Sequence, residues 1–217
     1  MRQRNFRALI ASVVLLMGLA VAGPAAAQPP GAGPWQHWYW SVTAGSYRAE
    51  DNPGQLASPG SELALGVGVG YRYTRHLSLE VEVPLFYSRY DTPATVSPPP
   101  FGTIDDRSSV NTAGIAGNVV LNTGGQRVRG FVGVGAGLYW SRFSVGGQSF
   151  GLTGTYERDD SGFGSQWLAG VDLRVGRRSW LGLEYRRVNL TANFGQVTNG
   201  DIDLGGRFVL LAFRSGF

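Results

Sequence analysis

Residues 206–217 read GRFVLLAFRSGF, and this stretch decides the fold. After Arg207 the odd-numbered positions are apolar with one serine as the exception, namely Val209, Leu211, Phe213 and Phe217. An apolar residue at every second position over about ten residues predicts a β-strand with lipid on one side. We interpret the stretch as the closing strand of a barrel and read the rest of the chain outward from it.

The N-terminal residues have the pattern of a secretory signal peptide. Three arginines precede a mostly apolar run at 8–22, and small residues occupy 25–27. A spanning helix needs about 20 apolar residues, and this run is shorter, as is every later apolar run. We therefore expect a removed signal at 1–27, a flexible periplasmic lead-in at 28–37 and a single barrel domain at 38–217.

Charge and cysteine content exclude several classes of protein. The formal charge of the 217 residues is +4, but three arginines belong to the expected signal, which leaves 16 Arg against 15 acidic residues. That balance does not indicate a nucleic-acid partner. With no Cys in the chain, disulfides and thiolate metal sites are excluded.

Working backward from the closing strand, alternation predicts seven more strands. The clearest is 61–73, where Leu, Val and Tyr alternate with Glu, Ala, Gly and Arg. The connections between strands alternate long and short, which is typical of an up-and-down membrane barrel with long loops outside and tight turns in the periplasm. The longest loop is expected at 143–163. The facing of the strand at 110–121 stays open because small residues fill both faces. The eight expected strands are 38–47, 61–73, 77–90, 110–121, 128–142, 164–175, 180–190 and 206–217.

Charged residues on the strands mostly share the face opposite the large apolar residues. An eight-stranded barrel has an interior that side chains just fill, and buried charges must pair. We therefore predict an interior plug of ion pairs, with a gated pore as the alternative. Its members are Glu62, Arg72, Glu80, Glu82, Arg129, Asp172, Arg174, Glu184, Arg186 and Arg214.

Four arginines break the pattern of the apolar face: Arg89, Arg142, Arg187 and Arg207. Each stands at the end of its strand nearest a long loop, which places all four at the external rim. Guanidinium groups match phosphate in a bidentate manner. The hypothesis is that they contact lipopolysaccharide phosphates, and the alternative is solvation of strand ends.

This architecture resembles the small eight-stranded outer-membrane barrels, a group that includes the outer membrane protein A transmembrane domain and the Ail/OmpX adhesins. The resemblance implies that Phe217 is read as an assembly signal by the barrel assembly machinery. A soluble β-sandwich or lipocalin-type barrel is the alternative fold. The face of large apolar residues argues against it.

One stretch suggests catalysis. His76, Ser78 and Glu80 stand at alternate positions, and a His-x-Ser pair near a carboxylate resembles the outer-membrane lipid A deacylases. However, His76 falls in an expected periplasmic turn, far from such substrates. We predict no catalytic residues, no metal site and no cofactor.

The expected function is that of a non-enzymatic outer-membrane protein with a structural or adhesin-like surface role. A small gated channel for polar or amphipathic solutes is the first alternative, and a lipid A-modifying hydrolase is the second. The expected partners are outer-membrane lipids including lipopolysaccharide, the assembly machinery and an unidentified extracellular ligand. We expect a monomer.

Overall fold

The computed structural model describes residues 37–49, 62–91, 107–149, 152–193 and 201–217. The expected signal peptide and nearly all of the expected lead-in lie outside the described residues. Within them, no helix is long and apolar enough to cross a membrane.

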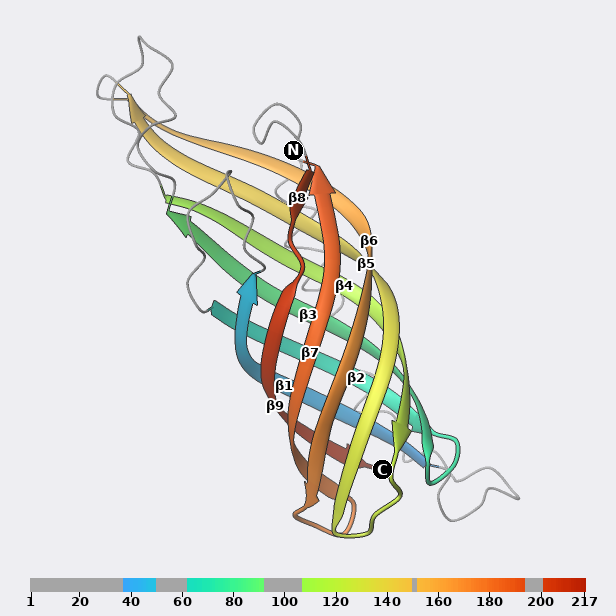
Figure 1. Ribbon diagram of the computed structural model, residues 1–217. Helices are drawn as coiled ribbons and strands as arrows, with labels where there is room; N and C mark the ends of the chain where they lie inside the picture. The colour runs from blue at the N-terminus through green and yellow to red at the C-terminus, as the bar shows by residue number, and fades with distance from the viewer. Residues whose placement is uncertain (1–36, 50–61, 92–106, 150–151, 194–200) are drawn as a thin grey trace.

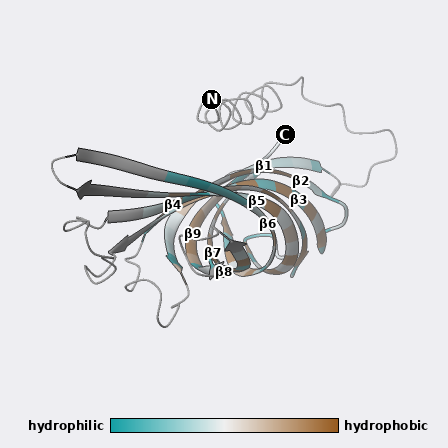
Figure 2. Cartoon of the chain, turned by 90° about the horizontal axis from the view of Figure 1, so that it is seen from above, coloured by the Kyte–Doolittle hydropathy of each residue, from teal (hydrophilic) through white to brown (hydrophobic). Residues whose placement is uncertain are grey.

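The described residues form a sheet of antiparallel strands that closes on itself (Figure 1). Each strand from β1 to β7 pairs with the next along the chain, β7 also pairs with β9, and β9 pairs with β1 to complete the ring. Figure 2, the view from above, shows the strand ribbons arranged around this ring. The strands are β1 (His37–Ala49), β2 (Glu62–Arg72), β3 (Leu77–Asp91), β4 (Arg107–Asn122), β5 (Val128–Ser149), β6 (Leu152–Arg174), β7 (Ser179–Asn193), β8 (Asp201–Asp203) and β9 (Gly206–Gly216).

The barrel wall has eight strands, as the alternation predicted. Nine strand labels are used because β8 and β9 are two parts of a single strand of the wall. Both pair with β7, and they are separated only by Leu204 and Gly205. The amide N–H groups of these two residues both donate to the carbonyl of Leu190 on β7, at 2.8 and 3.0 Å. The ladder therefore continues past the interruption.

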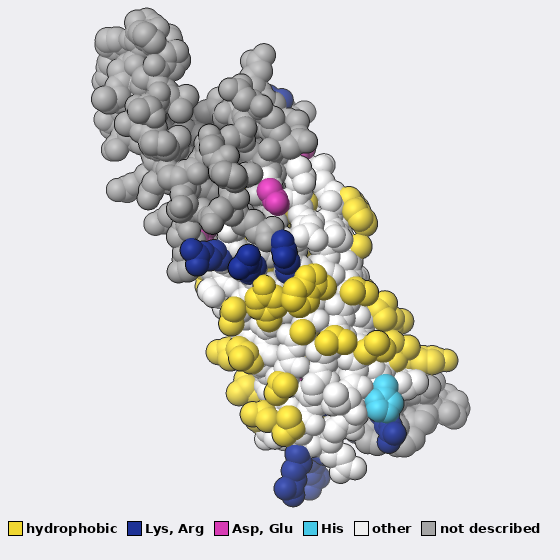
Figure 3. Space-filling view, in the orientation of Figure 1, with side chains coloured by type: hydrophobic (Ala, Val, Ile, Leu, Met, Phe, Trp, Pro, Cys, Tyr) yellow, Lys and Arg dark blue, Asp and Glu magenta, His cyan; other side chains and the backbone are white. Residues whose placement is uncertain are grey.

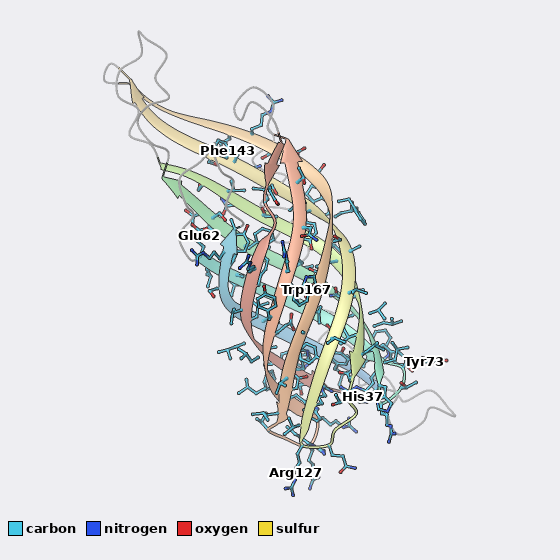
Figure 4. All side chains as sticks on the ribbon, in the orientation of Figure 1. His37, Glu62, Tyr73, Arg127, Phe143 and Trp167 are labelled. Carbon is cyan, nitrogen blue, oxygen red and sulfur yellow. The ribbon has the colours of Figure 1, made fainter. Side chains whose placement is uncertain are left out.

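The strand connections divide between the two ends of the barrel. Short turns join β2 to β3, β4 to β5 and β6 to β7, at the end where β1 begins and β9 finishes. At that end the N–H of Phe217 donates to the carbonyl of Trp38 at 3.2 Å. Figure 4 places His37, Tyr73 and Arg127 at this turn end and Phe143 toward the opposite one.

The two faces of the wall differ as the alternation predicted. Large apolar side chains point outward, with Leu65, Val134 and Leu211 exposed by 43%, 64% and 61%. Figure 3 shows that such side chains form a belt around the displayed face, with arginines at its margins. Glu82 and Arg186 point inward and are buried. A barrel with this outer surface is suited to hydrocarbon rather than water.

The structure settles the facing of β4. Ile115, Val119 and Leu121 are exposed on the outer face, whereas Ala116 and Asn118 are buried inside. Sequence pattern alone could not decide this because Gly and Ala occur on both faces.

The prediction of a long loop at 143–163 is wrong. These residues instead continue β5 and β6 as an antiparallel ladder up to the pair Ser149 and Leu152. Part of the extension also pairs with β4, up to Gly146 opposite Arg107. The many glycines and polar residues made the segment look like a loop, but backbone hydrogen bonds do not depend on side-chain type.

Candidate functional site

A network of ion pairs crosses the half of the barrel interior nearest the short turns. It joins three acidic residues to three arginines from five strands. The side chains are between 1% and 6% exposed, so the charges are removed from water. The members are Glu82 on β3, Arg129 on β5, Asp172 on β6, Glu184 and Arg186 on β7, and Arg214 on β9.

Two arginines link the acidic residues into a continuous chain. Arg186 donates to Glu82 through Nη1 and to Glu184 through Nε and Nη2, the latter two at 3.0 and 2.6 Å. Arg214 donates to Glu184 at 2.5 Å and to Asp172 at 2.7 Å. Each of these guanidinium groups therefore lies between two carboxylates.

Arg129 ends the chain. Its Nε and Nη2 donate to Asp172 Oδ2 at 2.8 and 2.7 Å, and its guanidinium lies 4.3 Å from the Trp180 ring. Arg214 lies similarly over Phe131, at 4.8 Å. Buried ions cost several kcal/mol each in lost hydration, and shared pairing and cation–π contacts offset that cost.

Neutral side chains extend the network on the Glu82 side. The amide Nε2 of Gln166 donates to Glu82 and to Asn118, both at 2.7 Å. Tyr139 donates its hydroxyl to Gln166 Oε1 at 3.2 Å. Sequence reasoning missed Gln166 and Asn118, although both stand on the inward face of their strands, which is the signal that could have found them.

Small residues make room for the network. A Cβ at Gly182 would stand 2.0 Å from Asp172 Oδ1, and one at Gly135 would stand 1.9 Å from Asn118 Oδ1. Any larger residue at these two positions would displace a member of the network.

The other predicted plug residues lie apart from this chain of ion pairs. Glu80 accepts a hydrogen bond from the Tyr39 hydroxyl, and the Arg72 guanidinium lies 5.8 Å from the Tyr39 ring. Glu62 is half-buried at the far end of β2. The prediction that Arg174 belongs to the interior plug is wrong. Its side chain is exposed and donates to the carbonyls of Gly176 and Arg177, because β6 ends at this residue.

The half of the interior nearest the long connections is mainly apolar, which the sequence interpretation did not anticipate. Tyr47, Phe86 and Phe208 form its centre, with ring centroids 4.6 to 5.3 Å apart. The Tyr47 hydroxyl donates to the Leu204 carbonyl at 2.8 Å. Between this cluster and Arg186 lies a cavity of only about 10 Å³. The other buried members are Ala49, Ala64, Val110, Tyr139, Phe143, Val188, Leu190, Leu204 and Leu210.

The four predicted rim arginines have different surroundings. Arg207 lies directly opposite Arg187 on the next strand. Arg142 is largely buried and donates to both carboxylate oxygens of Asp159, at 2.7 and 3.1 Å. The side chain of Arg89 lies outside the described residues. Arg48, which was not predicted, stands opposite Arg207 on the other side.

The suggested catalytic residues are held in structural contacts. His76 Nδ1 bonds the Asn122 carbonyl at 2.9 Å, and Arg75 Nε donates to its Nε2 at 2.7 Å. Ser78 accepts a hydrogen bond from the Asn122 amide at 3.2 Å. Both ring nitrogens are thus engaged away from the serine. In the part of the chain that the structure describes, no three His, Cys, Asp or Glu residues could hold a metal ion.

Comparisons with known proteins agree with the fold. Neisserial surface protein A shares 19% identity at a TM-score of 0.50, covering 83% of this chain and 97% of its own. OprG of Pseudomonas aeruginosa shares 13% identity at a TM-score of 0.57, covering 84% and 97%. No curated protein matches in sequence. The family model described as "outer membrane protein beta-barrel domain" matches residues 11–208. The chain therefore belongs to this family, and it is an eight-stranded barrel of the outer membrane.

Proposed function

We propose that the barrel is a non-enzymatic, non-conducting scaffold that presents the β5–β6 hairpin at the cell surface for interaction with another macromolecule. The single observation that supports this is the length of the hairpin. β6 leaves β7 at Gly164, opposite Leu190, while the β5–β6 ladder continues from Leu138 and Phe163 to Ser149 and Leu152. Twelve further residues on each strand, at about 3.3 Å each, would extend the hairpin by roughly 40 Å.

The hairpin is a regular antiparallel ladder rather than an irregular loop. Only two residues connect its strands, and Arg142 pairs with Asp159 across the ladder near its base. Figure 1 shows β5 and β6 running well beyond the end of β7. A rigid extension of this kind holds its surface at a fixed distance from the membrane, as suits recognition.

The edge of β6 is the part of the hairpin best suited to binding. Among the described residues, β7 pairs with β6 only from Gly164 onward, so the preceding part of β6 has β5 alone as its neighbour. An edge strand offers backbone N–H and C=O groups to an incoming strand. Glu157, Arg158 and Asp159 are exposed along this edge and would restrict which strands can pair there.

The filled interior supports the non-conducting part of the proposal. The ion-pair network occupies one half of the described lumen and the aromatic cluster occupies the other. The cavity that lies between the two halves, of about 10 Å³, has room for about one water molecule.

The experiment replaces residues 145–156 with Asn-Gly, which retains the pair Ser144 and Glu157 and supplies a two-residue hairpin turn. Cells displaying the trimmed protein should lose attachment to epithelial monolayers and to immobilised matrix proteins. The barrel itself should still fold, as judged by heat-dependent mobility in SDS gels. Attachment equal to that of the parent protein would refute the proposal.

A second variant tests which part of the edge binds. Glu157→Thr with Arg158→Thr keeps the hairpin length and its ladder but removes two exposed charges. Retained attachment would assign binding to the backbone edge, whereas loss of attachment would assign it to the charged side chains.

A further inference from the structure

Three arginines form a row across neighbouring strands of the outer wall. Arg207 on β9 is the register partner of Arg187 on β7 and of Arg48 on β1. Side chains directly opposite each other on antiparallel strands point to the same face, with Cβ atoms about 4.5–5.5 Å apart. The row therefore spans about 10 Å of the wall, two strand spacings. Arg48 and Arg207 are exposed and Arg187 is half-buried.

The row marks the margin of the apolar belt. Two residues nearer the turn end, the outward positions are Tyr185, Val209 and Ser46, again in register. The next outward tier is Leu183, Leu211 and Ala44. Figure 3 shows arginine side chains in a line along the upper edge of the belt on the face it displays.

An aromatic pair flanks the row on β6 and β7. Trp167 is the register partner of Arg187, and its ring lies 5.2 Å from that of Tyr185. Trp and Tyr are typical of the level where hydrocarbon meets lipid headgroups. This fixes the height of the row independently of the belt.

We infer that Arg48, Arg187 and Arg207 together bind the phosphate of an anionic lipid in the outer leaflet. Guanidinium forks donate paired hydrogen bonds to phosphate oxygens, and three adjacent forks suit a group with two or more negative charges. The lipid's acyl chains would lie along the tier of Leu183 and Leu211 below. Arg142 stands on β5, outside this row of register partners.

The test compares lipid retention by the parent barrel and by the triple variant Arg48→Gln, Arg187→Gln, Arg207→Gln. The purified proteins are exchanged into neutral detergent and incubated with phosphatidylglycerol, phosphatidylcholine, or lipid A with and without its phosphates. Bound lipid is counted by native mass spectrometry. We expect the triple variant to lose roughly tenfold or more of its affinity for the phosphate-bearing anionic lipids and none for phosphatidylcholine.

The matched control is Arg127→Gln, Arg177→Gln, Arg178→Gln, which removes the same charge from exposed arginines at the turn end. It should retain the parent's lipid preference. If the control lost as much affinity for anionic lipid as the triple variant, net charge would explain the effect and the proposed phosphate site would be wrong. Unchanged lipid retention in the triple variant would also refute the site. Preference for phosphatidylglycerol or for phosphorylated lipid A then identifies which lipid supplies the phosphate. Heat-dependent gel mobility verifies that every variant has folded.

Discussion

The two halves of the barrel interior are filled in opposite ways. Near the short turns, carboxylates and guanidinium groups satisfy one another at 2.5 to 3.0 Å. Near the long connections, aromatic rings pack at centroid distances of 4.6 to 5.3 Å. The first arrangement depends on the position of each atom, whereas the second depends mainly on volume. Ion pairs therefore fill the half of the lumen near the short turns, and nonpolar packing fills the half near the long connections.

The largest effect should come from opening both halves together. We expect no conductance from the parent barrel in planar bilayers, nor from Glu82→Ala with Arg186→Ala, because the aromatic half remains closed. Phe86→Ala with Phe208→Ala should also stay closed. Combining all four changes should give single-channel steps.

The double variant Glu82→Ala with Arg186→Ala is the informative control for this experiment. Conductance from it alone would mean that the aromatic cluster does not seal the lumen, and the two halves would then not be independent barriers.

Within the charged half, a volume-conserving change should be costly. Glu184→Gln removes the carboxylate that both Arg186 and Arg214 bind. Breaking a buried ion pair from one side costs about 3–5 kcal/mol, so we expect a loss of about 3 kcal/mol in the free energy of unfolding. Urea unfolding from lipid vesicles, followed by Trp fluorescence, measures it. The exposed Glu157→Gln should change stability by less than about 0.5 kcal/mol.

The smallest effect should come from reshaping the aromatic half. Phe208→Leu keeps an apolar side chain in the cluster and forfeits part of the ring contacts with Tyr47 and Phe86. A loss of about 1 kcal/mol is expected in the same unfolding assay. A loss as large as that of Glu184→Gln would show that this half is equally demanding in geometry, and the contrast would not hold.

Sequence periodicity predicted the number of strands and the facing of most of them. It could do so because successive side chains of a strand point to opposite faces of the barrel wall. It also predicted which charges point inward, apart from Arg174 at a strand end. It could not predict which arginine binds which acid. Glu82 and Arg186 are 104 residues apart and meet across the lumen, where no strand register relates them.

Two other features were hidden for different physical reasons. Tyr47, Phe86 and Phe208 stand on the inward faces of three strands, and the periodicity of each strand does not show that their rings meet at one level of the lumen. The row of arginines needed the register of β1 against β9, which joins the two ends of the barrel sequence. Arg48 and Arg207 are neighbours only because the ring closes.

The strand that closes the ring also carries Arg214, whose guanidinium lies between Asp172 on β6 and Glu184 on β7. Without that strand, the carboxylates of Asp172 and Glu184, which lie close together on the neighbouring strands β6 and β7, lack the guanidinium group that they share in the closed barrel. Pairing of β9 in its observed register therefore both closes the barrel and supplies the shared cation, and a shifted register would move Arg214 away from these two carboxylates.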